Sequence, residues 1–304
     1  MSSTAQDTYK INRTPIYIIL GLALALVAGV LFGSRYFFNK VALQPVAMAP
    51  VPAPMADSPE CTQLIDGLPS KIATYPRAEL AEPAPSGSAA WQKSSTERVT
   101  LRCGVDLPLQ YNEYAEEFMI TELDGVKWLQ VNDPASTMAT WFSVDRSPVL
   151  AVTADTELID EPPVMEIDAA SLPQSDAQPA PAPTSTLAEG DTAACGDLEQ
   201  AAPVEIADGF VNVHVDREDT LVWIKPGFEP VVLRCGVALP PGYDAGAALT
   251  QVNEIPWFQD EADATTVYYA LGRAADVAAT FPITGSNEII TNLSDFIAET
   301  VPAQ

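Results

Sequence analysis

An internal duplication limits the folds open to this chain more than any other feature. The ten residues 99–108, VTLRCGVDLP, agree with residues 231–240, VVLRCGVALP, at eight positions. Matching residues surround both motifs in one order: Cys61, Trp91, Cys103, Trp128 and Arg146, then Cys195, Trp223, Cys235, Trp257 and Arg273. Corresponding gaps differ by at most three residues. We therefore expect two tandem copies of one small domain, each with its own core.

Local patterns predict a helix and a strand in the first copy. Ser58, Pro59 and Glu60 form a typical helix start, and an apolar face follows at Cys61, Leu64, Ile65 and Leu68. Apolar and polar residues alternate over 99–105, which indicates a half-buried strand. The alternation points Cys103 into the same core as Cys61 and places Arg102 on the opposite face.

The remaining elements are predicted more coarsely. A closing helix is expected at 287–301, capped by Ser286, and no counterpart is found in the first copy, which we expect to be abbreviated. The fold class is therefore α+β: two tandem, small, disulfide-bonded domains of antiparallel sheet plus helix, behind one N-terminal transmembrane helix. Further strands are expected around 118–131, 140–153, 211–215, 221–224 and 265–270.

The N-terminal segment 14–34 predicts a membrane-spanning helix. It contains no charged residue, is bounded by Arg13 and Arg35, and would be about 31 Å long as a helix, enough to cross a bilayer. A cleaved signal peptide is the alternative, although the apolar run is longer than is usual for one. Flanking positive charges are tied at two on each side. The cysteines favour a cytoplasmic N-terminus, residues 1–13, with the bulk of the chain outside.

Two proline-rich segments divide the rest of the chain. Residues 35–60 are expected to form a semi-rigid tether that lifts the first domain, residues 61–157, away from the membrane. Residues 158–194 are acidic and rich in proline, and their composition predicts a linker that buries no core. The second domain is expected at residues 195–301.

Four cysteines permit three pairings, and the duplication selects one of them. Each copy contributes one early cysteine and one in its repeated strand, so Cys61–Cys103 and Cys195–Cys235 are the pairs expected. A reactive thiol is the alternative, but alternation turns the neighbouring Arg102 and Arg234 to the other face of the strand.

Composition excludes several classes of function. The chain has 41 acidic and 15 basic residues, with a formal net charge of -26, which disfavours nucleic-acid binding. Its single histidine, His214, cannot build a multi-histidine metal site, so neither metal nor cofactor is expected. The sequence contains no G-x-S-x-G, Walker loop, H-E-x-x-H or G-x-G-x-x-G motif. Acidic pairs such as Glu116-Glu117 keep an envelope hydrolase open only as a remote alternative.

The duplicated arginines and tryptophans are the candidate binding residues. An arginine can pair with a carboxylate of its own domain or present a fork to an anionic ligand. A tryptophan can fill the core or line a surface for sugars or peptides. Clustering of Arg102 with Trp91 around one pocket would favour a binding module. The candidates are Arg102, Arg234, Arg146, Arg273, Trp91, Trp223, Trp128 and Trp257.

The order of Cys, Trp, Leu-Arg-Cys-Gly-Val, Trp and Arg resembles the domain of unknown function 3515 of actinobacterial exported proteins. The resemblance covers residues 61 to 157 and 195 to 300. It implies a membrane-associated, disulfide-bonded envelope protein and brings no activity. We therefore expect a non-catalytic, single-pass protein of the cell membrane, partnered by another envelope protein or a cell-wall component. An extracytoplasmic binding module for a small molecule or cell-wall fragment is the alternative.

Overall fold

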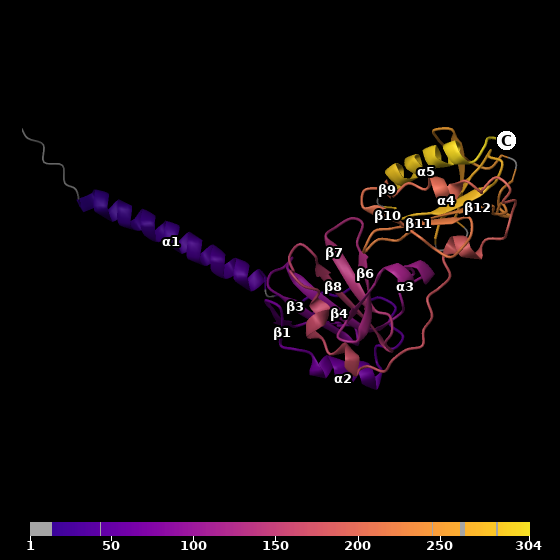
Figure 1. The fold of residues 1–304 in the computed structure, drawn as a ribbon. Coiled ribbons are helices and arrows are strands. Elements are labelled where there is room, and N and C mark those ends of the chain that lie inside the picture. Colours follow the sequence, from indigo (N-terminus) through magenta and orange to yellow (C-terminus); the bar gives the residue numbers. More distant parts are fainter. Residues whose placement is uncertain (1–13, 43, 245, 262–264, 284) are drawn as a thin grey trace, which may run out of the picture.

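The computed structural model describes residues 14–304 except 43, 245, 262–264 and 284. A long N-terminal helix precedes two domains, each built on an eight-stranded antiparallel sheet (Figure 1). The expected cytoplasmic segment, residues 1–13, lies outside the described residues. The helices are α1 (Thr14–Ala42), α2 (Pro59–Gly67), α3 (Glu113–Phe118), α4 (Leu198–Ala201) and α5 (Ser286–Thr300), and the short 3-10 helices are η1 (Pro163–Glu166), η2 (Ala169–Ser171) and η3 (Pro183–Thr186).

The two sheets have the same topology, strand for strand. The first has the order β1-β2-β3-β4-β8-β7-β6-β5, and the second has β9-β10-β11-β12-β16-β15-β14-β13. The first comprises β1 (Lys71–Ile72), β2 (Tyr75–Ala78), β3 (Ser88–Gln92), β4 (Arg98–Val105), β5 (Ile120–Leu123), β6 (Val126–Asn132), β7 (Met138–Ser143) and β8 (Val149–Asp155). The second comprises β9 (Glu205–Ala207), β10 (Phe210–Val213), β11 (Thr220–Ile224), β12 (Val231–Cys235), β13 (Thr250–Val252), β14 (Ile255–Asp260), β15 (Val267–Ala270) and β16 (Val277–Thr280). The predicted α+β class and the duplication are thereby confirmed.

Turn chemistry explains where the sequence-based elements differ from the structure. Asp124 and Gly125 both have positive φ, so a tight turn splits the segment predicted at 118–131 into β5 and β6. Helix α3 was not predicted; Asn112 caps it, because its Oδ1 accepts hydrogen bonds from the N–H groups of Tyr114 and Ala115. Helix α5 begins at Ser286 itself, after Gly285 at the cap position, so Ser286 is not the cap.

Each core lies between one face of a sheet and the helices that cover it. In the second copy, α5 supplies four buried side chains to that core: Ile289, Leu293, Phe296 and Ile297. In the first copy, η1, η2 and the residues after them occupy the matching place, and Val164, Ile167, Ala169 and Leu172 are buried there. The expectation that residues 158–194 bury no core is therefore wrong. A short 3-10 cap closes the first copy instead of a helix.

The proline-rich stretch before the first domain also differs from the expected tether. Helix α1 continues to Ala42, and residues 44–57, which we call strap 1, lie against the first sheet. Val46 is buried and pairs with Leu80, and the Gln44 carbonyl accepts a hydrogen bond from Gln92 Nε2 at 2.8 Å. Strap 1 is therefore part of the domain and not a spacer, because the sheet binds its backbone.

The second copy has an equivalent strap, residues 180–192, which we call strap 2. It runs from α3 of the first copy to the second sheet, and the Glu113 N–H donates to the Ala180 carbonyl at 3.0 Å. Tyr114 and Phe118 of α3 pack with Ala182 against the outer face of β10–β12. The apolar residues of that face are Val213, Val215, Val222, Ile224 and Val232. This interface joins the two copies into one head.

Candidate functional site

The repeated Leu-Arg-Cys-Gly-Val motif is where each strap crosses its sheet. In the first copy the Met55 N–H donates to the Gly104 carbonyl at 3.1 Å; in the second, the Gly190 N–H donates to the Gly236 carbonyl at 2.8 Å. Both motif glycines have positive φ, and a Cβ on Gly104 would lie 2.3 Å from the Met55 carbonyl carbon. Only glycine leaves room for a backbone this close.

The motif arginines hold the straps in place. Arg102 donates to the Ala49 carbonyl of strap 1. Arg234 is only 8% exposed and donates through Nη1 to the Thr184 and Leu187 carbonyls of strap 2, at 2.9 and 3.0 Å. Both arginines lie opposite the cysteine face, as the alternation predicts. Their shared task is to bind strap carbonyls.

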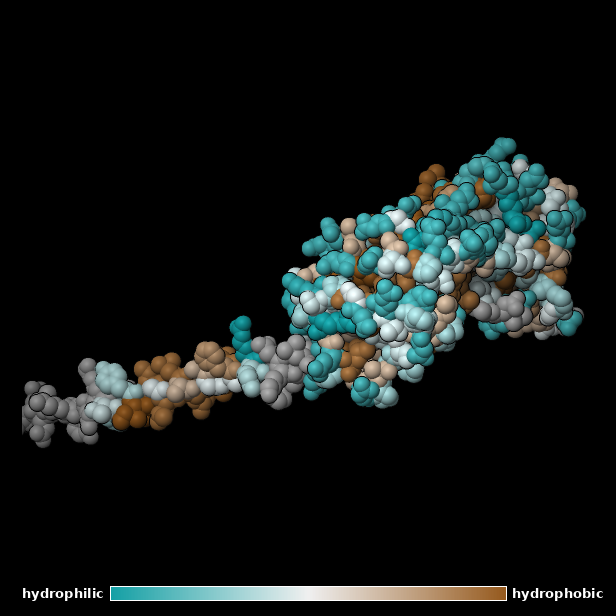
Figure 2. Space-filling model, turned by 90° about the horizontal axis from the view of Figure 1, so that it is seen from below, coloured by the Kyte–Doolittle hydropathy of each residue, from teal (hydrophilic) through white to brown (hydrophobic). Residues whose placement is uncertain are grey.

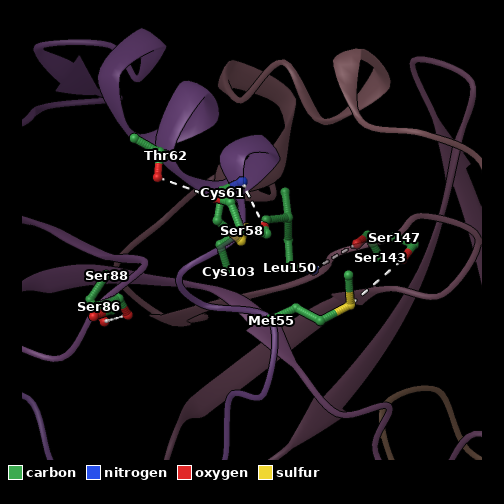
Figure 3. Close-up of a disulfide and its surroundings, with 10 residues drawn as sticks. All are labelled: Met55, Ser58, Cys61, Thr62, Ser86, Ser88, Cys103, Ser143, Ser147 and Leu150. Atoms are coloured by element: carbon green, nitrogen blue, oxygen red, sulfur yellow. Dashed lines mark hydrogen bonds between the residues drawn. A yellow bond between two sulfur atoms is a disulfide. The ribbon is translucent and has the colours of Figure 1, made fainter.

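The motif cysteines form the expected disulfides. Cys61 bonds to Cys103 and Cys195 bonds to Cys235, and no free cysteine remains among the described residues. Figure 3 shows Cys61 at the start of α2, where the Ser58 hydroxyl oxygen accepts its N–H at 3.2 Å. The first bridge ties α2 to β4, and the second ties the segment just before α4 to β12. The pairing predicted from the duplication is confirmed.

The four candidate tryptophans are buried in the cores. Trp91, Trp128, Trp223 and Trp257 are at most 2% exposed. Matching indole N–H groups donate to matching carbonyls, Trp91 to Pro69 at 2.9 Å and Trp223 to Pro203 at 2.8 Å. Because the arginines of the motif lie on the other face of the sheet, no cluster of Arg102 with Trp91 forms. These tryptophans stabilise the domains.

Arg146 and Arg273 are buried beside equivalent hairpin turns. Arg146 donates to the carbonyl of Gly125 and pairs with Asp145 at 2.9 Å. Arg273 lies 3.6 Å from Glu254, at the turn between β13 and β14. Each arginine also pairs through its backbone with the segment that closes its copy. Each arginine therefore links a hairpin turn to the segment that closes its copy.

The remaining polar candidates lie apart from one another. His214 is exposed, 3.7 Å from Asp216. Glu116 forms an ion pair with Lys127 and accepts a hydrogen bond from the Tyr111 hydroxyl at 2.8 Å. Burial, and after it this hydrogen bond, raises the pKa of Tyr111. Across the described part of the chain, no group of three or more His, Cys, Asp or Glu side chains could hold a metal ion.

A polar pocket of about 440 Å³ lies where strap 2 crosses the second sheet. Arg217 and Arg234 provide its positive charges, and Glu189, Glu218 and Asp219 provide its negative ones. Gly190, Thr192, Cys235 and Gly236 complete its lining. This pocket is the candidate site. Sequence reasoning selected Arg234 but missed Arg217, Glu189 and Asp219, because they lie outside the repeated motif.

Asp219 stands where the first copy has Gly87. The carbonyls of Gly87 and Asp219 accept the N–H groups of Cys103 and Cys235, at 2.8 and 2.9 Å, and both residues have positive φ. Burial, followed by repulsion from Glu218, raises the pKa of Asp219. The sequence therefore did contain a signal for this site. The second copy has an acid, Asp219, at the position where the first copy needs a glycine, Gly87.

Asp219→Gly is expected to raise the free energy of unfolding at pH 7 by about 1 kcal/mol, because it relieves positive-φ strain and removes a partly buried carboxylate. A raised folded pKa means that this carboxyl group costs stability above its usual pKa, so the gain should shrink as pH falls toward about 4. Urea denaturation at several pH values measures it.

The reciprocal change, Gly87→Asp, is the matched control. It should destabilise the protein, because a Cβ there would lie 2.9 Å from the Cys103 carbonyl oxygen. A less stable Asp219→Gly variant at pH 7 would contradict the assignment of strain to Asp219.

Two copies of one strapped, disulfide-bonded α+β domain behind an apolar helix define the class of this protein. The family described as protein of unknown function (DUF3515) matches residues 20–171 and again residues 164–304. The chain belongs to this family. Comparison with curated proteins found no match, and comparison with solved structures also found none. Each family match includes the strap as well as the sheet, so the strap belongs to the repeated unit.

Proposed function

We propose that the chain is a non-catalytic accessory protein of the cell envelope, anchored in the membrane by α1 and displaying both domains outside the cytoplasm. The observation that carries the proposal is the surface of α1. Residues Tyr17–Tyr36 have a mean hydropathy of 2.3, and none of this span is buried against the domains. Figure 2 shows the apolar helix extending from one end of a mostly hydrophilic head. A bilayer would cover this surface.

The disulfides support the orientation. Structural disulfides persist in oxidising compartments, so a head with a bridge in each copy fits the outside of the cell. Positive charges flank the helix equally and do not contribute to this argument.

The position of strap 1 limits where the partner lies. Only residue 43 separates the end of α1 at Ala42 from Gln44, whose carbonyl is bound by the first sheet. Helix α1 continues for six residues beyond Tyr36, about 9 Å at 1.5 Å per residue, so the head stays close to the membrane surface and does not reach out on a long tether. We propose that its partner is another envelope component close to the membrane.

A paired variant tests the anchor. Leu24→Arg combined with Val27→Arg adds about 3 kcal/mol of insertion cost per arginine at the helix centre, so the chain should leave the carbonate-resistant membrane fraction. The control carries two arginines on exposed apolar positions of the head, Leu109→Arg and Leu158→Arg, and should remain in the membrane. Recovery of the unmodified chain as a soluble protein with a shortened N-terminus would overturn the anchor.

Protease treatment of intact cells tests the orientation. We expect the head to be cleaved outside the cell, with a protected fragment containing α1. Protection of the whole head would place it in the cytoplasm. Chemical cross-linking in the same cells should recover a reproducible membrane-proximal partner, and the absence of one would contradict the accessory role.

A further inference from the structure

We propose that the pocket beside Arg234 binds a free amino acid, with the ligand carboxylate on Arg234 and Arg217 and the ligand ammonium on the carboxylates opposite. This inference does not depend on membrane anchoring. It begins from Arg234, a residue that is only 8% exposed and lines the pocket.

Arg234 is a buried charge without a direct ion pair. Asp219, which lines the same pocket, attracts its charge only through space. The Nη1 of Arg234 binds two strap carbonyls, and none of the carboxylates in the described chain forms an ion pair with this arginine. A buried guanidinium normally has an anionic partner, because desolvation of an unpaired charge is costly. The edge of Arg234 that does not bind the strap therefore suits a ligand carboxylate, which a guanidinium can bind through two parallel hydrogen bonds.

The rest of the lining selects against a simple anion. Three carboxylates, those of Glu189, Glu218 and Asp219, face two arginines, so the formal charge of the lining is -1 by subtraction. A doubly charged phosphate would be repelled by the carboxylates, whereas a zwitterion satisfies both signs. A volume of about 440 Å³ accommodates a single amino acid.

The first copy fills the matching position with its own chain. Gly87 lies under strap 1, where an added Cβ would be 3.0 Å from the Ala56 carbonyl oxygen, and Arg102 binds the Ala49 carbonyl. The second copy has Asp219 at this position and a strap that crosses at Gly190 and Thr192. In the first copy the chain itself therefore fills this position, whereas the second copy has a pocket lined by charged side chains.

Calorimetric titration of the detergent-solubilised full-length chain tests the proposal. The probes are glycine, alanine, glutamate and lysine, with acetate, methylamine and inorganic phosphate as partial mimics. At least one amino acid should bind, and acetate and methylamine should each bind about tenfold more weakly or worse, since each lacks one charged contact. Absence of binding by all four amino acids, or tighter binding of phosphate than of any of them, would overturn the proposal.

Two variants locate the site. Arg217→Gln and Asp219→Gly should each weaken amino-acid binding about tenfold, and both are expected to fold, since Arg217 is partly exposed and glycine suits the backbone of residue 219. Arg102→Gln is the matched control in the first copy and should leave the affinity unchanged. Equal affinity in the wild-type, Arg217→Gln and Asp219→Gly proteins would refute binding at this pocket.

Discussion

Gly104→Ala is expected to lower the free energy of unfolding by about 3 kcal/mol, because the new methyl group meets both a strained backbone and the strap. At φ +83° an L-residue is disfavoured, and the added Cβ would lie 2.3 Å from the Met55 carbonyl carbon and 2.4 Å from the Ala56 nitrogen. Both contacts are to backbone atoms. Strap 1 must move off the sheet to accommodate alanine. This movement breaks the hydrogen bond from the Met55 N–H to the Gly104 carbonyl.

Two further glycines separate strain from crowding. Gly125 has φ +73° and nothing within 4 Å of an added Cβ, so Gly125→Ala should cost only about 1 kcal/mol. At Gly236 the nearest atom is a Thr192 side-chain methyl, which can rotate away, so Gly236→Ala should fall between the other two. Urea denaturation of the three variants measures the order. Equal losses at Gly104 and Gly125 would show that strap 1 contributes nothing to the cost.

The duplication made much of the fold predictable. Two copies of one strand fixed the disulfide pairing, and the alternation within residues 99–105 separated the face of Cys103 from that of Arg102. Helix α5 could also be predicted, because its apolar residues are regularly spaced over 15 residues. These inferences succeeded because each depends on periodic burial, which a sequence displays directly.

The straps could not be predicted in this way, because their composition is that of a solvated linker. Strap 1 consists mainly of proline and alanine and shows no apolar period, and it is bound chiefly through its carbonyl and N–H groups, which every sequence has. The cap of the first copy was missed for a related reason. Val164, Ile167 and Leu172 follow no helical or strand period, because short 3-10 turns position them.

The candidate site was only half predictable. Arg234 could be selected because its position repeats, but its burial without a direct ion pair depends on strap 2, whose course the sequence did not reveal. The tryptophans repeat in the two copies just as the arginines do, but they lie in the cores. Repetition alone therefore identifies what the fold needs. The difference between the copies, Gly87 against Asp219, is the better guide to a specialised pocket.

Cys61→Ala combined with Cys103→Ala is expected to lower the free energy of unfolding by about 4 kcal/mol, the largest loss among these changes. The bridge joins residues 42 apart, and opening a loop of this length returns about that much conformational entropy to the unfolded chain. Both cysteines are fully buried, so removing the sulfurs also leaves a small void in the core.

Ser58→Ala is the matched control, since it changes the same helix and keeps the disulfide. It removes the cap that accepts the Cys61 N–H and should cost about 1 kcal/mol. Urea denaturation of both variants, monitored by tryptophan fluorescence, compares their losses in the free energy of unfolding. The gap between them should change little with salt concentration, because neither variant adds or removes a charged group. If the double variant unfolds at the wild-type urea midpoint, the disulfide does not carry the stability of the first domain, and its core and strap 1 must hold it alone.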